Sequence, residues 1–187
     1  RRQRQMCIRD RVTVTFEPRF TLTIGNQLVI GSSVSFAEGS VSVDKAPGDD
    51  DKYAKGTVVT LTASPASGYG FRSWAGTSND TSNPTTVTIS SNKHVTVTFE
   101  LRFPLTINNQ AVTGPSVNFT EGSVSLNPAP GKDAKYAKDS TVTLTASPAS
   151  GYRFDHWEGD ASGNVTTVTI TMNSNKSVTA AFKKVYT

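Results

Sequence analysis

The chain repeats itself at a spacing of 83 residues, and this constrains its architecture more than any other feature. The run LTASPASGY at 61–69 recurs letter for letter at 144–152, and Trp74 has its counterpart in Trp157. Tandem near-copies arise by duplication and are typical of modular scaffolds, whose length or multivalency is selected. A duplicated unit therefore favours a structural or multivalent role over a single active site.

The same spacing divides the chain into parts. The segment VTVTFE at 12–17 matches 95–100, the segment that closes the first complete copy. We therefore interpret it as the closing strand of a preceding copy, and the sequence as a fragment of a longer array. The expected division is a tail at 1–11, the closing strand of a truncated preceding repeat at 12–18, repeat domain 1 at 19–101, repeat domain 2 at 102–184 and the start of a truncated third repeat at 185–187.

The tail RRQRQMCIRDR at 1–11 has no counterpart in the repeat and resembles one reading frame of a common sequencing-library adapter. We interpret it as non-native and outside the fold. The whole chain has a net charge of +4, but removing the five arginines and one aspartate of the tail leaves 14 basic and 14 acidic residues. The net charge of the repeats is thus zero, so the basicity of the chain does not indicate nucleic-acid or membrane binding.

Apolar and polar residues alternate over short runs such as 20–24, 59–63 and 95–99. Alternation places Val, Leu, Ile and Phe on one face of a strand and Thr or Ser on the other. Pro, Gly and Asn separate the runs, as expected for turns. The pattern predicts an all-β fold with two tandem small antiparallel β-sheet domains, β-grasp-like or sandwich-like, six or seven short strands per copy and little or no helix.

The string Y-A-x-G-T-V-x-x-L-T-A-x-P-x-x-G-Y-x-F-x-x-W-x-G at 53–76 is followed by T-V-T-I and N-K-x-V-T-x-x-F. This combination, carried by both copies over 19–183, resembles the divergent internalin-B-type B-repeat, a bacterial surface repeat module. The resemblance implies an exported, non-catalytic β module that often stands in arrays beside ligand-binding or catalytic domains. There are two departures: the stretch from Ile24 to Gly39 is long enough to add a strand or a hairpin, and Asp139 stands where the first copy has Gly56.

The aromatic residues allow two interpretations. They form the core, because each aromatic side chain buries about 150–250 Å², or they form a platform for a sugar; we favour the core. Lysines surround a further tyrosine in each copy, which suits a position at the rim. The predicted core residues are Tyr69, Phe71, Trp74, Tyr152, Phe154 and Trp157, and the weaker ligand-platform candidates are Tyr53 and Tyr136.

No metal site is predicted. The acidic run 49–51 could ligate calcium through its carboxylates. The corresponding residues of the second copy are Lys132, Asp133 and Ala134, so a solvated turn is the better interpretation. The histidines, His94 and His156, occupy non-equivalent positions with no second ligand beside them in the sequence, which disfavours a transition-metal site.

No catalytic site or cofactor is predicted either. Asp155 and Glu158 flank Trp157, but their counterparts in the first copy are Arg72 and Ala75. A paired-carboxylate hydrolase site needs both carboxylates, so this difference argues against one. The sequence also lacks a nucleophile elbow, a phosphate-binding loop and a dinucleotide fingerprint.

Two functions from different classes are compatible with these features. The first is a non-catalytic extracellular stalk, spacer or multivalent adhesive scaffold of a bacterial surface or secreted protein. The alternative is a glycan-binding accessory module of a secreted enzyme. Inward aromatics and a Thr/Ser surface would favour the first, and an exposed aromatic strip the second. Expected partners are a host-surface or cell-wall glycan or protein, without nucleic acid or membrane contact by this segment, and we expect a monomeric fragment.

The connection between the copies is expected to be short. Only the residues 100–102 separate the strand ending at Phe99 from the strand starting at Phe103. Three residues are too few for a flexible linker. We therefore predict two separate domains arranged end to end as a semi-rigid rod.

Overall fold

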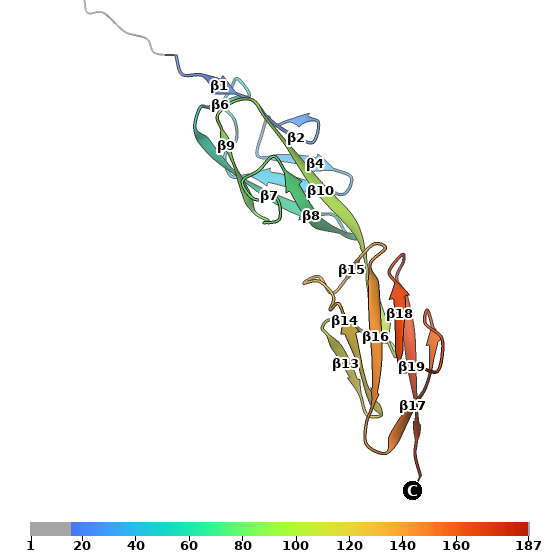
Figure 1. Cartoon of the computed structure of the whole chain (residues 1–187). Coiled ribbons are helices and arrows are strands. Elements are labelled where there is room, and N and C mark those ends of the chain that lie inside the picture. Colours follow the sequence, from blue (N-terminus) through green and yellow to red (C-terminus); the bar gives the residue numbers. More distant parts are fainter. Residues whose placement is uncertain (1–15, 187) are drawn as a thin grey trace, which may run out of the picture.

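The computed structural model describes residues 16–186, which form two lobes arranged end to end (Figure 1). The described residues contain strands and no helix, so the predicted all-β fold is confirmed. The tail at 1–11 lies outside the described residues, as do residues 12–15 of the expected closing strand.

Each copy consists of two four-stranded sheets. The first sheet of copy 1 is antiparallel throughout and has the order β4-β5-β7-β9. In the second sheet, β10 lies between β2 and β8, and β3 pairs with β2. The strands of copy 1 are β2 (Leu22–Ile24), β3 (Gln27–Leu28), β4 (Ser33–Phe36), β5 (Gly39–Val43), β7 (Thr57–Pro65), β8 (Tyr69–Ala75), β9 (Thr85–Ile89) and β10 (Lys93–Phe103).

Copy 2 repeats this arrangement with the sheets β13-β14-β16-β18 and β12-β11-β19-β17. Two further two-residue strands, β1 (Arg19–Phe20) and β6 (Tyr53–Ala54), pair with each other at the start of copy 1. Each copy thus has more strands than the six or seven predicted, because pairs of two residues carry no readable alternation. The strands of copy 2 are β11 (Leu105–Ile107), β12 (Gln110–Ala111), β13 (Ser116–Phe119), β14 (Gly122–Asn127), β15 (Tyr136–Ala137), β16 (Thr141–Pro148), β17 (Tyr152–Gly159), β18 (Thr167–Thr171) and β19 (Lys176–Lys184).

The alternating sequence explains how the sheets face each other. In β7, Val59 and Leu61 are fully buried while Thr60 between them is half-buried on the opposite face. Leu22 of the second sheet belongs to the same buried cluster as Leu61 of the first. Each copy is therefore a small sandwich around its own core, and the buried clusters of the two copies share no residue.

One pairing in each copy differs from the antiparallel expectation. β2 opens copy 1 and runs parallel to β10, which closes it, with Leu22 opposite Lys93. β11 and β19 pair in the same way in copy 2. The difference arises because β10 already pairs antiparallel with β8 on one edge, and its other edge receives the first strand of the copy in the same direction. Period-two alternation does not distinguish these two directions.

Both departures from the family pattern are accommodated within the sandwich. The stretch between Ile24 and Gly39 adds the short strand β3 and the strand β4, which forms a hairpin with β5. In the turn before β7, Gly56 has a φ of 86°, and Asp139 adopts the same left-handed region with a φ of 62°. Aspartate tolerates this conformation better than most residues with a Cβ, so the turn keeps its shape in copy 2.

Candidate functional site

The two copies are joined by a strand rather than by a linker. β10 pairs with β8 of copy 1 through Leu101, and its last two residues, Arg102 and Phe103, pair with Ala137 and Tyr136 of copy 2. Phe103 packs against the core of copy 2. The short connector predicted at 100–102 is thus a continuous extension of the closing strand, visible in Figure 1 as the segment that passes from one lobe to the other.

Arg102 contacts both copies at this junction. Its backbone N–H donates to the carbonyl of Gly68 in copy 1 over 2.9 Å. Its Nη2 donates to the carbonyl of Lys135 in copy 2, also over 2.9 Å. Its Nε lies 3.2 Å from Oδ2 of Asp133, an ion pair that lacks the alignment of a hydrogen bond. With 19% of its side chain exposed, Arg102 is well shielded from water, which strengthens these charge contacts.

Two glycines make room for the arginine. A Cβ added to Gly70 of copy 1 would meet Cδ of Arg102, and one added to Gly131 of copy 2 would meet its Nη2, both at 2.3 Å. The side chain therefore lies against bare backbone on each side. We refer to Arg102, Gly70, Gly131, Asp133 and the Lys135 carbonyl as the junction clamp.

The copy 2 half of the clamp has a duplicate at the start of copy 1. Arg19 donates through Nη2 to the Lys52 carbonyl over 2.7 Å and lies 3.1 Å from Asp50. A Cβ on Gly48 would meet Nη2 of Arg19 at 2.3 Å. Every residue of this second set lies 83 positions before its counterpart. The clamp was not predicted, although the sequence contains a signal for it: Asp50 recurs as Asp133 while the aspartates on either side of it do not recur.

The predicted core aromatics fall into two groups. Trp74 and Trp157 are each 2% exposed, and Phe154 is also buried. Each indole N–H donates to a loop carbonyl, over 3.0 Å to Ser82 and over 2.9 Å in copy 2. Phe71 is half-buried against its core. Tyr69 and Tyr152 stand apart: both are half-buried and belong to neither core cluster, because they begin their strands at the edge of the lobe.

The ligand-platform prediction for Tyr53 and Tyr136 is corrected by their burial. Both side chains are 3% exposed and belong to the cores. Burial raises the pKa of each phenol to about 12, with the carboxylate of Asp44 adding to the shift for Tyr53. Neither ring offers a face to a ligand. The neighbouring lysines suggested a rim position, but each ring is buried although most of the lysines beside it are exposed.

Asp50 of the acidic run 49–51 and Asp44, which precedes the run, make separate contacts. Asp50 pairs with Arg19, and Asp44 accepts hydrogen bonds from the backbone and the hydroxyl of Thr60 at 2.6 and 3.1 Å. These hydrogen bonds hold the pKa of Asp44 below its usual value. Within residues 16–186, His, Cys, Asp and Glu side chains form no group of three suited to a metal ion.

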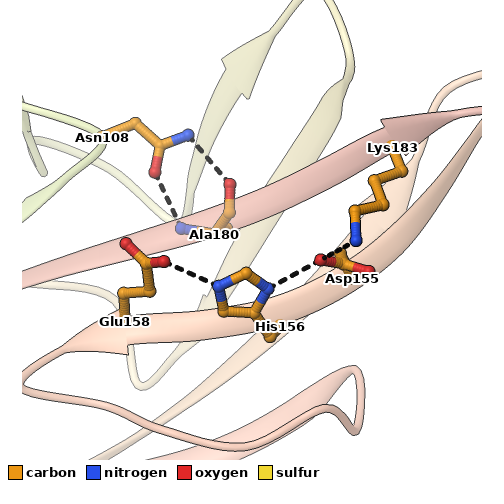
Figure 2. Close-up of polar contacts among 6 residues, drawn as sticks. All are labelled: Asn108, Asp155, His156, Glu158, Ala180 and Lys183. Carbon is orange, nitrogen blue, oxygen red and sulfur yellow. Dashed lines mark hydrogen bonds and ion pairs between the residues drawn. The ribbon is translucent and has the colours of Figure 1, made fainter.

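A polar cluster on the outer face of β17 surrounds His156 (Figure 2). Nδ1 of the ring lies 2.8 Å from Oδ2 of Asp155, and Nε2 lies 2.7 Å from Oε1 of Glu158. Lys183 of β19 lies 2.9 Å from the same Asp155 oxygen. His156 and Glu158 share a face because they are two residues apart in a strand, and a bulge between Phe154 and His156 brings Asp155 beside them.

The electrostatics of this cluster favour ionised side chains. The hydrogen bond that the ring donates to Glu158, followed by the one that it donates to Asp155, raises the pKa of His156. The contacts of Lys183 and then His156 lower the pKa of Asp155. His156 was predicted to have no second ligand beside it, so these contacts were not predicted, although the two-residue spacing of His156 and Glu158 in a strand is a signal for them. The carboxylates of Asp155 and Glu158 both pair with basic side chains, so the cluster is a surface ion-pair network.

Asn108, also labelled in Figure 2, makes its side-chain hydrogen bonds to Ala180 of β19 and not to the His156 cluster. Its side-chain amide accepts a hydrogen bond from the Ala180 N–H over 2.8 Å and donates to the Ala180 carbonyl over 3.2 Å. Its own backbone N–H donates to Val178. Asn108 thus extends the parallel pairing of β11 with β19, as Gly25 does through its backbone alone in copy 1.

Comparison with protein families matches the divergent InlB B-repeat domain over residues 32–102 and again over 115–186. The chain belongs to this family. The two matched regions reproduce the two-copy organisation predicted from the 83-residue spacing. The chain therefore consists of two tandem modules of a bacterial repeat family. Comparisons with curated proteins and with solved structures gave no match. In the described part of the chain, no helix has the length and apolarity to cross a bilayer.

Proposed function

We propose that the two B-repeats act as a non-catalytic, semi-rigid spacer in an extracellular or cell-surface protein, setting the distance and direction of whatever the array carries. One observation carries the proposal: the closing strand of copy 1 continues into copy 2 and is fixed there by the junction clamp. A strand with hydrogen bonds on both sides of a boundary bends less freely than an unpaired linker. Copies so joined interact mainly with their neighbours, as in other tandem arrays.

Two further features support a spacer. The contacts of Arg19 reproduce the copy 2 side of the clamp. Copy 1 therefore holds the strand that enters it in the same way as copy 2 holds the end of β10. The tryptophans lie inside the sandwiches, while outward faces carry threonine pairs such as Thr145 and Thr167, whose hydroxyls lie 3.4 Å apart. Such a surface suits an exposed module without large apolar contacts.

The test is a comparison of Arg102→Ala with Arg19→Ala in the full chain. Residual dipolar couplings of the unmodified chain should fit one alignment tensor for both copies, and small-angle scattering should give a radius of gyration well above the ~16 Å of a single globule of this length. Arg102→Ala should separate the tensors of the two copies. Arg19→Ala removes the same contacts away from the junction, so it should leave the shared tensor intact.

Two results would contradict the spacer. One is a pair of unrelated tensors in the unmodified chain, which would mean that the copies reorient freely despite the shared strand. The other is a radius of gyration near that of a single globule. If Arg102→Ala and Arg19→Ala behave alike, the strand alone would fix the orientation and the clamp would have no role in it.

Glycan binding is retained as the second candidate because of one observation, a cleft at the junction that is lined by aromatic and charged residues of both copies. It is separate from the tryptophans and from Tyr53 and Tyr136, all of which are buried.

A further inference from the structure

A cleft of about 360 Å³ opens beside the junction clamp. It lies where the start of β8 in copy 1 meets the loop before β15 in copy 2, with the end of β10 between them. Its volume is in the range of small-molecule sites and is sufficient for one or two sugar rings. Its lining residues are Pro65, Tyr69, Gly70, Phe71, Arg102, Lys132 and Asp133.

The copy 1 wall of the cleft is aromatic. Tyr69 and Phe71 line it, and both are half-buried, so part of each side chain remains accessible. Of the aromatics predicted to fill the core, Tyr69 is one of the two that stand outside it. An aromatic ring with a polar tip provides an apolar face together with a hydroxyl, a combination that suits a ligand with both apolar and polar edges.

The copy 2 wall of the cleft carries an uncompensated positive charge. Asp133 pairs with Arg102, which also lies 3.8 Å from Glu100 of β10. Lys132 is exposed and takes part in none of the ion pairs found within residues 16–186. A ligand in the cleft therefore meets an apolar aromatic surface, the oxygen acceptors of Asp133 and one free ammonium group.

We propose that this cleft binds an acidic saccharide, one sugar residue of the uronic acid class at the end of or within a longer glycan. The apolar face of the sugar ring packs on Tyr69, its carboxylate pairs with the Lys132 ammonium, and its hydroxyls donate to Asp133. The cleft exists only while the copies keep the relation proposed above, so the inference rests on the spacer geometry. The site belongs to the junction, and neither copy forms it alone.

The combination of residues occurs at one place in the described chain. At the far end of copy 2, Gly70 is replaced by Arg153 and Arg102 by Val185, and Arg153 pairs with Asp155 at 3.7 Å. In the loop of copy 1, the position of Lys132 is occupied by Asp49. The repeats thus share a backbone, while within residues 16–186 only this junction joins an open aromatic wall to a lysine outside the ion pairs.

The test titrates the full chain with a trimer of galacturonate and, separately, with a neutral trimer of galactose. The amide resonances of Tyr69, Gly70 and Lys132 should shift when the acidic trimer is added at millimolar concentration. The neutral trimer should bind much more weakly and shift them much less. Tyr69→Ala and Lys132→Gln should each weaken binding about tenfold or more. Tyr152→Ala alters the equivalent tyrosine at the far end of copy 2, so it should leave binding unchanged. Tyr69→Phe keeps the ring and should retain most of the affinity.

Several outcomes would overturn the proposal. They are equal binding of the two trimers, equal binding of an acidic peptide such as hexaglutamate, the absence of any shift at millimolar trimer, and full affinity in the Tyr69→Ala variant. Dipolar couplings on the same samples show whether the copies keep one alignment tensor. If the unmodified chain does not bind the acidic trimer although both copies share one alignment tensor, the saccharide site is refuted and the spacer is not. If the two copies of the unmodified chain have separate tensors, the spacer is refuted.

Discussion

Copy 1 and copy 2 pair their strands in the same register, yet several of their polar contacts are built from different residues. Val41 lies opposite Ala63 in copy 1, and Val124 lies opposite Ala146 in copy 2. Beside this shared backbone, the bulge in the strand that carries the tryptophan holds an arginine in one copy and an aspartate in the other. The fold therefore depends on the apolar alternation and the ladder, and the outer face is free to vary.

The bulge shows how far this freedom extends. In copy 1, Arg72 lies 4.0 Å from Glu100 of β10. In copy 2 the signs are reversed, with Asp155 facing Lys183 of β19 at 2.9 Å. Both copies thus place opposite charges on the two strands. The positive charge is on the tryptophan-bearing strand in copy 1 and on the closing strand in copy 2. Exposed pairs of this kind contribute little to stability, so the direction of the pair is only weakly constrained.

The hydrogen bond of the buried indole N–H, unlike the surface ion pairs, is the same in both copies. The loops after the two tryptophans differ in sequence but keep the 83-residue spacing, since Val59 lies opposite Val87 in copy 1 and Val142 lies opposite Ile170 in copy 2. Nevertheless each indole N–H finds a loop carbonyl, that of Ser82 in copy 1 and that of Val165 in copy 2. A buried donor without a partner is costly, so the contact persists at the same backbone position although the residue that supplies the carbonyl has changed.

The largest expected effect concerns the independence of the two cores. Leu61→Ala and Leu144→Ala each truncate a fully buried side chain and should lower the free energy of unfolding of their own copy by about 2–5 kcal/mol. Since the buried clusters share no residue, each change should leave the other copy nearly unaffected. Urea titrations followed by amide resonances of each copy measure this. A common transition that shifts equally in both variants would mean that the copies unfold as one unit.

A smaller effect is expected at the equivalent tyrosines. The Tyr53 hydroxyl donates to the carbonyl of Lys45 over 3.0 Å, whereas the buried Tyr136 hydroxyl has no partner within the described chain. Tyr53→Phe should therefore lower stability by about 1 kcal/mol, and Tyr136→Phe should be neutral or stabilising. Chemical denaturation of the two variants gives both values. Equal losses would show that the Tyr136 hydroxyl is satisfied in solution.

Much of the fold is predictable because its causes are local. Alternation of apolar and polar residues over runs such as 59–63 is sufficient to assign strands and their buried faces. The direction of the pairing between β2 and β10 cannot be predicted in this way, because a three-residue alternation is compatible with parallel and with antiparallel neighbours. Two-residue strands such as β1 and β6 are below the length at which a period can be read.

The candidate site was less predictable because it depends on contacts between distant residues. Arg102 and Asp133 are 31 positions apart, and nothing in the local sequence around either residue indicates their pairing. Comparison of the copies could have indicated it, since Arg19 and Asp50 stand at the same spacing. For Tyr69, residue type correctly indicated an apolar surface but did not distinguish a core position from a cleft wall.

The smallest expected effect tests the difference at the bulge by pH. Copy 2 has His156 between two carboxylates, where copy 1 has Ser73. Because the pKa of His156 is raised by Glu158 and then by Asp155, the charged ring stabilises the folded state. This contribution is fully present below the unfolded pKa of about 6.5 and is lost as the pH rises through the higher folded pKa. It belongs to copy 2 alone.

Proton NMR titration of the His156 ring measures this directly. Its pKa should lie above the ordinary histidine value, and Glu158→Gln should lower it, because the largest contribution to the shift is then removed. Glu38→Gln, on a turn of copy 1, serves as the control and should leave the His156 titration unchanged. The shift should also shrink with added salt, since the ring is partly exposed and its charge contacts are screened. A His156 pKa at or below its ordinary value would mean that the carboxylates do not hold the ring in solution, and the two bulges would then be electrostatically equivalent.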